Sequence, residues 1–276
     1  MSTDPILRTI PSTGEQVPAI GLGSWQTFDV DDIAPITPVL RRFLELGGRV
    51  IDSSPMYGKS EAAIGKMLAA IAKTDPKLAA PFLATKVWTE GKHVGIAEMK
   101  RSIARLGAPA KLDLMQIHNL VDWKTHLATL REWKAAGTIR YLGITHHAHR
   151  AFDDLEQILK TEQLDFVQLP YSVADRAVEK RLLPAAADWG VAVLVMQPFA
   201  SGRLFTRVKG KALPAVAGEL GCSSWGQLFL KFLLGHPAVT CPLPATSKVT
   251  HVEDNLGALR GPVPDATQRK AILAAI

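Results

Sequence analysis

Short apolar runs recur along the chain, and most of them begin about 25 to 32 residues apart, which is the length of one strand–helix unit. The runs are continuous rather than alternating, as expected of parallel strands that are covered on both faces. Eight runs follow this pattern, at residues 19–22, 50–52, 82–85, 112–117, 141–144, 166–169, 191–196 and 239–243. They predict a parallel sheet whose strands alternate with helices.

Amphipathic helical patterns fill the segments between the runs. From Ile36 to Leu44 the apolar residues stand at i, i+3, i+4, i+7 and i+8, which places them on one helix face, and two glycines then end the pattern. Ser60 precedes a second pattern that extends to Ile71 and is a candidate N-cap. Further helices are predicted at residues 94–106, 124–136, 151–162, 180–189 and 224–234.

Eight strands and their helices within roughly 250 residues predict an α/β fold, the (β/α)8 TIM barrel. A doubly wound sheet is the alternative. The one glycine-rich segment, residues 21–26, lacks the third glycine and the acidic residue of a dinucleotide fingerprint. Turn residues 11–14 between two short apolar runs predict an N-terminal β-hairpin. Because no linker or change of composition divides the chain, we expect one domain over residues 1–276.

Composition narrows the class of protein. Of the 276 residues, 47% are hydrophobic and 21% are charged, as in ordinary globular proteins. The net charge of +6 comes from scattered basic residues, which favours small anionic ligands and argues against a nucleic-acid partner. No apolar run is long enough to cross a membrane, and residues 1–13 lack the apolar core of a signal peptide.

The cysteines and clustered histidines do not predict a metal site. Cys222 and Cys241 have no metal-binding spacing, and we expect them to be reduced thiols. His146, His147 and His149 lack the i, i+4 spacing and the Cys or carboxylate partners of a zinc site. We therefore expect a cytoplasmic protein without a metal, present as a monomer or a small homo-oligomer.

Three successive apolar runs end in ionisable residues. The second run ends in Asp52, the third in Lys86 and the fourth in His118, and Tyr57 follows Asp52 by five residues. In a barrel of parallel strands these ends meet on the face where active sites lie. We therefore expect the four side chains to converge.

Their chemistry is that of proton donation to a carbonyl oxygen. A lysine and an aspartate in a partly buried place have to pair, because an unpaired charge there is costly. A tyrosine next to the lysine is expected to have its pKa lowered by the cation, and it can then donate a proton to a developing alkoxide. A histidine at the same rim can orient a carbonyl oxygen by a hydrogen bond. Taken singly, each residue is more simply explained by a structural role, and it is the combination of all four at successive strand ends that indicates a catalytic site.

Several segments resemble the aldo-keto reductases. Residues 52–58 match the D-x-x-x-x-Y-G signature of that family, residues 82–88 (FLATKVW) its lysine strand, and residues 112–118 (LDLMQIH) its histidine strand. The resemblance continues through residues 135–145, 166–172 and 243–255. It implies a carbonyl reductase in which hydride passes from C4 of a nicotinamide to the carbonyl carbon. By the same resemblance, Tyr57 is the general acid, Lys86 lowers its pKa, Asp52 holds Lys86 and His118 orients the substrate.

The resemblance also implies contacts to the coenzyme. The nicotinamide carboxamide is held by Gln168 and by Thr145-His146, which replace the usual Ser-Asn pair, and Met196 stands where the family has a stacking aromatic ring. The pyrophosphate loop supplies Gln197, Phe199, Ser201 and Gly202. The 2′-phosphate site comprises Thr246, Ser247, Lys248 and His251, the last in place of an arginine, and Asn255 contacts the adenine. Lys248 favours NADPH, and NADH stays open as the alternative.

Aromatic residues after three of the strands predict the substrate pocket. Trp25, Trp88 and Trp123 follow strands 1, 3 and 4, and together with His118 they are expected to line the pocket mouth. Only 21 residues follow Asn255, too few for the long closing loop of many family members, so we expect an open pocket for small aldehydes.

Two alternative functions remain open. The first is a catalytically weak member of the same fold that senses the coenzyme or regulates. The second is an unrelated barrel hydrolase or isomerase, for which the paired carboxylates or metal ligands are missing at the strand ends.

Overall fold

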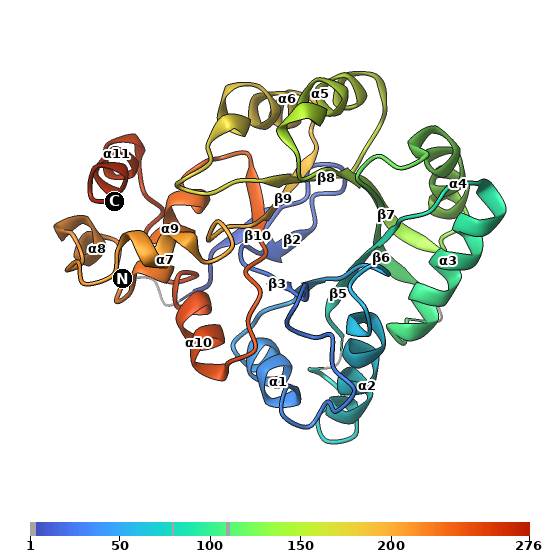
Figure 1. The fold of residues 1–276 in the computed structure, drawn as a ribbon, viewed down its shortest axis with the longest axis horizontal. Coiled ribbons are helices and arrows are strands. Elements are labelled where there is room, and N and C mark those ends of the chain that lie inside the picture. Colours follow the sequence, from blue (N-terminus) through green and yellow to red (C-terminus); the bar gives the residue numbers. More distant parts are fainter. Residues whose placement is uncertain (1–3, 79, 109–110) are drawn as a thin grey trace.

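The computed structural model describes residues 4–78, 80–108 and 111–276, and in them a sheet of eight parallel strands curls into a barrel (Figure 1). Neighbouring strands follow one another in the sequence, in the order β3 to β10, which excludes the doubly wound alternative and confirms the (β/α)8 fold. The barrel strands are β3 (Leu22–Gly23), β4 (Val50–Asp52), β5 (Phe82–Val87), β6 (Leu112–His118), β7 (Ile139–Thr145), β8 (Phe166–Pro170), β9 (Ala192–Met196) and β10 (Val239–Pro242).

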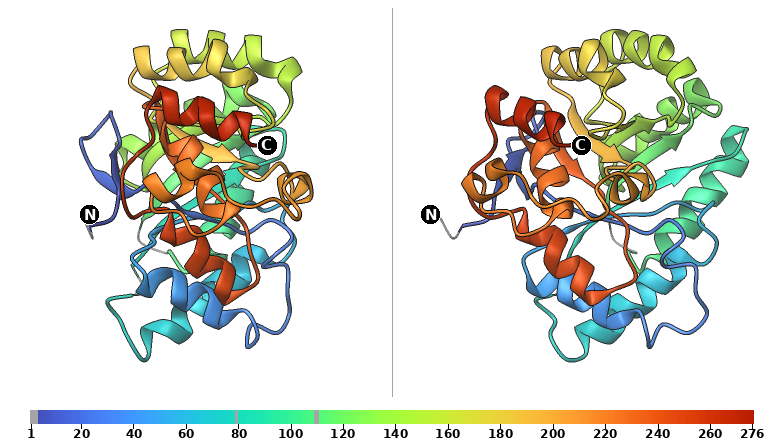
Figure 2. Two further views of the ribbon diagram at one scale, coloured as in Figure 1. Left: turned by 90° about the vertical axis from the view of Figure 1, so that its left-hand side faces the viewer. Right: turned by 60° about the vertical axis from the view of Figure 1, so that its left-hand side comes forward.

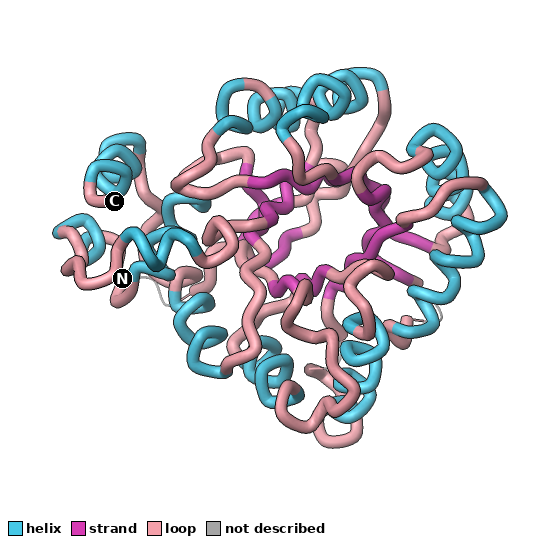
Figure 3. The backbone as a smooth tube through the Cα atoms, in the orientation of Figure 1, coloured by secondary structure: helices cyan, strands magenta, loops and turns pink. Residues whose placement is uncertain are grey.

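Helices form the outer layer around the ring of strands (Figure 3). Their apolar faces point inward, as in α1, where Val39, Leu40, Phe43 and Leu44 are buried. In the described residues the α-helices are α1 (Thr37–Glu45), α2 (Ser60–Ala72), α3 (Lys92–Arg105), α4 (Trp123–Ala135), α5 (Phe152–Thr161), α6 (Leu182–Asp188), α7 (Arg203–Arg207), α8 (Ala215–Glu219), α9 (Trp225–Leu234), α10 (Val249–Gly257) and α11 (Ala266–Ala274). Two short 3₁₀ turns, His149–Ala151 and Ala177–Lys180, precede α5 and α6.

The barrel closes between β3 and β10. The N–H of Gly21 donates to the carbonyl of Pro242 (2.9 Å), the N–H of Gly23 donates to that of Pro244 (3.1 Å), and a parallel bridge pairs Gly23 with Ala245. The prolines have no N–H to donate in return across this closure. β3 is only two residues long, and it pairs with β4 through the same two residues.

Glycine is required at this closure by the close approach of the two strands. A Cβ atom at Gly21 would lie 2.7 Å from Leu243 Cδ2 and 2.8 Å from the carbonyl oxygen of Val50. A Cβ atom at Gly23 would lie 2.9 Å from the carbonyl oxygen of Leu243. The pair of glycines that resembles part of a dinucleotide motif therefore serves the packing of the barrel.

The predicted N-terminal hairpin is present and projects at one end of the barrel (Figure 2). It consists of β1 (Leu7–Thr9) and β2 (Gln16–Pro18). Ile10 and Val17 belong to the apolar cluster inside the barrel. The Tyr141 hydroxyl of β7 donates to the carboxylate of Glu15 in the hairpin loop (2.5 Å), and Arg140 pairs with the same carboxylate. The hairpin thus covers the end of the barrel where the strands begin.

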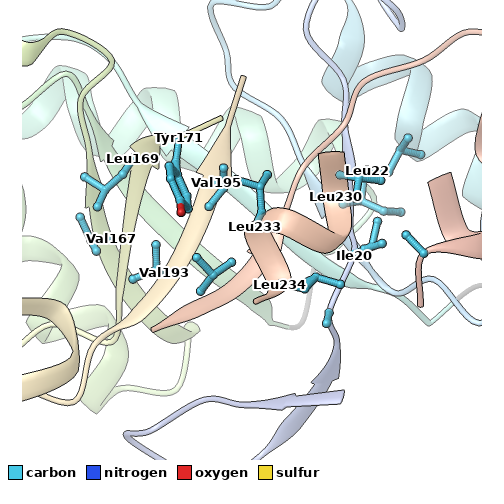
Figure 4. Close-up of a cluster of buried hydrophobic side chains, with 14 of the residues drawn as sticks. Ile20, Leu22, Val167, Leu169, Tyr171, Val193, Val195, Leu230, Leu233 and Leu234 are labelled. Atoms are coloured by element: carbon cyan, nitrogen blue, oxygen red, sulfur yellow. The ribbon is translucent and has the colours of Figure 1, made fainter. Parts of the chain in front are cut away.

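A larger apolar cluster lies between the strands and the surrounding helices. Figure 4 shows one part of it, in which side chains of α9 pack between those of β8 and β9 on one side and those around β3 on the other. Each fully buried Leu, Ile or Val stabilises the fold by about 1.5–3 kcal/mol. The labelled members are Ile20, Leu22, Val167, Leu169, Tyr171, Val193, Val195, Leu230, Leu233 and Leu234.

Two local expectations differ from the structure. Ser60 is the first residue of α2 and not its N-cap, which is Lys59. The N–H of Ser60 donates to the carbonyl of Tyr57 in a turn, and its hydroxyl donates to the carbonyl of Ser24 instead of capping the helix. Helices α7, α8, α10 and α11 are present where the hydrophobic pattern predicted none. Of the N-terminal segment expected to lack a signal sequence, residues 1–3 lie outside the described part.

Candidate active site

The four candidate catalytic residues meet at the end of the barrel opposite the hairpin. Asp52 is the last residue of β4, Lys86 lies one residue before the end of β5 and His118 ends β6. In the ladder, Lys86 pairs with Gln116, two residues before His118, so both positions of β6 point to the same side. The predicted convergence of Asp52, Lys86 and His118 is therefore what the register produces.

Lys86 and Asp52 form a buried ion pair. The Lys86 ammonium donates to Asp52 Oδ2 (2.6 Å) and to the carbonyl of Ser53 (2.7 Å), and Gln116 Nε2 donates to the other carboxylate oxygen (3.0 Å). Lys86 is fully buried. Burial alone would lower its pKa, but the charges and hydrogen bonds of Asp52 and Tyr57 together raise the pKa of Lys86, so the ammonium stays charged.

A turn places Tyr57 against this pair. The N–H of Tyr57 donates to the carbonyl of Ser54 (3.0 Å), and Pro55 stands at the second position, where its fixed φ favours a turn. The Lys86 ammonium lies 5.1 Å from the centroid of the Tyr57 ring, and the Tyr57 and His118 rings meet edge to face with centroids 6.0 Å apart.

The pKa of Tyr57 differs in direction from the expectation based on its lysine neighbour. Burial raises the pKa of Tyr57, Lys86 opposes that rise and Asp52 adds to it, and the net result lies above the ordinary value. The expectation of a lowered pKa is therefore wrong for the protein without ligands, because desolvation of the phenolate outweighs the attraction of the cation. Tyr57 is a protonated phenol at neutral pH.

His118 is an uncharged imidazole. Burial and the nearby Lys86 charge, with smaller contributions from His147 and His146, lower its pKa to about 3. Nδ1 of His118 lies 3.0 Å from the hydroxyl oxygen of the buried Ser54. The ring also lies beside the Trp88 indole, at 6.2 Å between centroids. A neutral imidazole at this position can donate a hydrogen bond to a carbonyl oxygen without adding a second positive charge to the site.

A cavity of about 790 Å³ opens over these residues. Its size is typical of a site for a cofactor together with a small substrate. Most of the residues expected at the coenzyme or substrate line it, namely Trp25, Asp52, Tyr57, His118, Gln168, Met196, Gln197, Phe199, Ser201, Gly202, Thr246, His251 and Asn255. The structure thus brings the strand ends of β4 and β6 and the loops after β9 and β10 to one site.

Several expected residues do not line this cavity. Lys86 is buried beside Tyr57, and Thr145 and His146 are buried at the end of β7. Ser247 and Lys248 are exposed next to Thr246. Trp88 is 43% exposed and stands beside His118 at the rim. Trp123 packs against the core at the start of α4, so the structure places it away from the predicted pocket.

The amide of Gln168 is an unpartnered donor in the cavity wall. Thr145 donates to Gln168 Oε1 at 3.5 Å, whereas Gln168 Nε2 is buried without a hydrogen-bond partner. A buried amide donor without a partner is costly, unless a ligand satisfies it. An amide-type carbonyl oxygen fits this atom. His146 Nδ1, in contrast, already accepts from the N–H of Ala148 (3.0 Å).

Left-handed backbone conformations concentrate around the cavity. In the described residues, seven non-glycine residues have a positive φ, and four of them, Gln26, Asn119, Gln197 and Ser201, line it. Such conformations cost about 1–3 kcal/mol each and are typical of functional loops. The loop at residues 197–202 carries two of the four, and its path past the strand ends is the usual phosphate position of a barrel.

At the far end of the cavity, the residues around α10 are held in place by hydrogen bonds. The hydroxyl of Thr246 accepts from the N–H of Lys248 (3.1 Å). The carboxylate of Asp254 accepts from the Ser224 hydroxyl (2.7 Å) and from Gln227 Nε2 (2.9 Å). The side chains of His251 and Asn255 complete this end of the lining.

The sequence patterns missed several residues of the site. Gln116, Ser54 and Ser24 support Asp52 and His118, and Gln26 and Asn119 line the cavity. For Gln116 a signal existed, since a polar residue two positions before His118 on a buried strand has to face the same side. The other four residues lie in turns, where the position of a residue along the chain does not predict the direction of its side chain.

The described residues contain neither a cluster of metal ligands nor a membrane-spanning helix. No group of three or more His, Cys, Asp or Glu side chains is arranged to hold a metal ion. No helix in the same part of the chain is both long and apolar enough to span a bilayer.

Comparison with known proteins identifies the family of this chain. Residues 19–272 match the model of the aldo/keto reductase family. An uncharacterized oxidoreductase of Schizosaccharomyces pombe is 28% identical over 254 residues, 86% of this chain and 78% of its own length. The NADH-specific methylglyoxal reductase of Escherichia coli is 26% identical over 76% of this chain and 73% of its own length. An aldo/keto reductase of Klebsiella pneumoniae, solved with NADP and acetate, superposes with a TM-score of 0.79 at 24% identity and covers 96% of this chain and 93% of that one.

With the family model covering almost all of its length, the chain belongs to the aldo/keto reductases, a family of oxidoreductases. The resemblance found in the strand-end motifs is thereby confirmed.

Proposed function

We propose that this protein reduces aldehydes or ketones to alcohols by hydride transfer from NADPH, with Tyr57 as the general acid. One observation carries the proposal: the protonated Tyr57 phenol and the neutral His118 imidazole line a large cavity, with the buried Lys86–Asp52 ion pair beside them. In this proposal one barrel domain, residues 1–276, supplies every group that the reaction needs.

The cavity offers matching groups for the coenzyme. The unpartnered Nε2 of Gln168 is the donor for the nicotinamide carboxamide, and Thr145 fixes the orientation of that amide. Met196 packs against the nicotinamide as a polarisable thioether in place of an aromatic ring. The loop with Gln197, Phe199, Ser201 and Gly202 surrounds the pyrophosphate, and Asn255 contacts the adenine. The Nδ1 atom of His146 already accepts a hydrogen bond, so in this proposal His146 contacts the nicotinamide carboxamide through Nε2 of its ring.

Proton transfer is the task of Tyr57. When bound, the reduced coenzyme supplies a hydride to the carbonyl carbon. Tyr57 gives its proton to the carbonyl oxygen, which would otherwise become an alkoxide. Because burial raises its pKa, the phenol holds this proton at neutral pH until the oxygen becomes basic enough to take it.

Lys86 lowers the free-energy cost of removing that proton from Tyr57. The phenolate that remains lies close to the Lys86 ammonium, whose positive charge is kept in place by Asp52. Gln116 in turn holds the second oxygen of Asp52. His118 donates to the carbonyl oxygen and turns it toward Tyr57. Each of the four residues thus has one role, and none has to change its net charge except Tyr57.

The choice of NADPH rests on Lys248 and its neighbours. An exposed ammonium, the hydroxyls of Thr246 and Ser247, and His251 suit a phosphate dianion. The Klebsiella structure contains NADP, whereas the Escherichia coli relative is named as NADH-specific. The absence of an arginine at His251 removes a permanent charge, so we expect a moderate preference for NADPH over NADH.

The rim of the cavity favours small or flat apolar carbonyl compounds. Trp25 and Met56 line it with much of their surface exposed, and Trp88 stands beside His118. Helix α11 lies beside α8 and α9 and away from the barrel centre (Figure 1), so this C-terminal helix does not cover the mouth. We propose an open pocket that accepts a range of small aldehydes.

An absorbance screen tests the proposal. Purified protein is mixed with NADPH, and in parallel with NADH, and coenzyme oxidation is followed over a panel of aldehydes, ketones and quinones. Tyr57→Phe, which removes only the hydroxyl, is expected to lower turnover by at least about 10²-fold while it still binds NADPH. Tight NADPH binding without turnover of any compound would favour the sensing or regulatory alternative. Near-normal turnover by Tyr57→Phe would remove Tyr57 from its role.

A further inference from the structure

Ser54 occupies a position that connects the turn of Tyr57 to His118. Its carbonyl accepts from the N–H of Tyr57 (3.0 Å), and its hydroxyl oxygen accepts from the N–H of Met56 (3.3 Å). The same hydroxyl lies 3.0 Å from His118 Nδ1, and the side chain is completely buried. One serine thus contacts both the general acid's turn and the imidazole that orients the substrate.

The direction of the Ser54–His118 hydrogen bond follows from counting donors and acceptors. A serine hydroxyl has one proton to donate. In the described structure Nδ1 of His118 is the acceptor within reach of Ser54 Oγ, while the N–H of Met56 already donates to that oxygen. If Nδ1 carried the imidazole proton, the Ser54 proton would be buried without an acceptor, at a cost of about 1–3 kcal/mol. The arrangement that satisfies every group has Ser54 donating to Nδ1.

We propose that Ser54 is a positioning residue that keeps His118 in the tautomer with its proton on Nε2, and that it fixes the ring relative to Tyr57. With Nδ1 engaged in the wall, Nε2–H is the polar group that the imidazole can present to the cavity that it lines. The opposite tautomer would present a lone pair there, and a lone pair repels a carbonyl oxygen. The catalytic consequence rests on the proposed carbonyl reduction, but the tautomer itself does not.

Nitrogen-15 NMR of histidine-labelled protein, without coenzyme or substrate, measures the tautomer directly. Protonated and unprotonated ring nitrogens have well-separated shifts, and the His118 signals among the eight histidines are assigned by their loss in His118→Gln. At pH 7 the wild-type protein should show His118 as one neutral form with the proton on Nε2. Ser54→Ala should give a mixture of both tautomers. Ser53→Ala, which removes a neighbouring buried hydroxyl that does not contact His118, should leave the His118 signals unchanged.

Kinetics supply the second measurement. For an aldehyde that the wild-type enzyme reduces, Ser54→Ala should lower kcat/KM by about 3- to 10-fold, the size expected for one lost hydrogen bond, while the Kd for NADPH stays the same. A wild-type His118 protonated on Nδ1 would overturn the proposal. So would an Ser54→Ala variant with an unchanged tautomer or unchanged kcat/KM. If no carbonyl compound is turned over, the proposed function fails, and the NMR spectrum alone decides the role of Ser54.

Discussion

Replacing Asp52 by asparagine removes one charge from the centre of the site and leaves its shape unchanged. The Asn side chain retains an oxygen that accepts from Lys86. Its new N–H2 group faces Gln116, whose Oε1 is buried without a partner and becomes available when that amide turns over. The hydrogen bonds of the pair are therefore kept, and the variant isolates the contribution of the carboxylate charge.

The expected cost is set by the ammonium that remains. Lys86 is fully buried and would lose the carboxylate that pairs with it, and breaking a buried pair in this way costs about 3–5 kcal/mol. The lysine can escape by losing its proton. From an ordinary pKa of about 10.4, that costs roughly 4–5 kcal/mol at pH 7, which gives a similar upper limit. We therefore expect Asp52→Asn to lower the free energy of unfolding by about 3–5 kcal/mol at pH 7.

The contribution of Lys86 to stability changes with pH in opposite directions in the wild type and in Asp52→Asn. In the wild type the pKa of Lys86 is raised, so the stability from this group is complete below about pH 10.4 and is lost only as the pH rises further. In Asp52→Asn, burial without the carboxylate lowers that pKa. The destabilisation caused by the buried charge then decreases as the pH rises toward about 10.4, because the ammonium loses its proton. The difference in the free energy of unfolding between the wild type and Asp52→Asn should therefore decrease by about 1–3 kcal/mol between pH 7 and pH 9.5.

Urea unfolding followed by circular dichroism at both pH values measures this difference. Glu132→Gln is the control, because it breaks the exposed Lys92–Glu132 pair (3.5 Å), which should be worth less than about 1 kcal/mol at either pH. A loss below about 1 kcal/mol for Asp52→Asn at pH 7, or a difference that widens with rising pH, would refute the assignment of a charged, buried pair.

Three further outcomes are expected from single changes. Lys248→Ala should weaken NADPH binding by about 1–3 kcal/mol more than NADH binding, measured by fluorescence titration, and equal losses would reject the 2′-phosphate assignment. Since the pKa of His118 is lowered to about 3, kcat/KM should show no ionisation of this residue between pH 5 and pH 8, and a break near pH 6.5 that His118→Gln removes would contradict this. Gly21→Ala should destabilise the barrel by about 1–3 kcal/mol, because its Cβ would lie 2.7 Å from a neighbouring side chain. The control is Gly218→Ala in α8, which has nothing within 4 Å and should be neutral or stabilising. Similar shifts in melting temperature for the two variants would contradict the packing argument.

Most of the barrel was predictable because its strands are buried on both faces and its helices on one. The run at residues 112–117 and the helix pattern from Ile36 to Leu44 correspond closely to β6 and α1. The run at 19–22 did not reveal that β3 would be so short, because its length is set by pairing with β4 on one side and with the chain around Pro242 and Pro244 on the other. Helix α11 had an unused signal in its capping box, in which Asp265 and Gln268 bond to each other's backbone.

Asp52, Lys86 and His118 were predictable as a group, since parallel register alone brings the strand ends together, and Tyr57 follows Asp52 by only five residues. The pKa shifts within this group were not predictable from the sequence. Whether Tyr57 gains or loses acidity depends on the balance between burial and the Lys86 charge, and that balance is set by packing. The supporting roles of Ser54 and Gln116 likewise depend on distances across the barrel. Trp123 shows the opposite case, in which a residue at the right place in the sequence turns toward the core.

The hairpin at the closed end of the barrel has a consequence for biosynthesis. Its loop residue Glu15 binds the hydroxyl of Tyr141, which is 126 residues further along the chain. At about 5–20 residues per second on the ribosome, the first partner waits roughly 6–25 s for the second to be made. During that interval Ile10 and Val17 have no barrel interior to enter, so the nascent hairpin exposes its apolar side to solvent and to any chaperone that binds apolar segments.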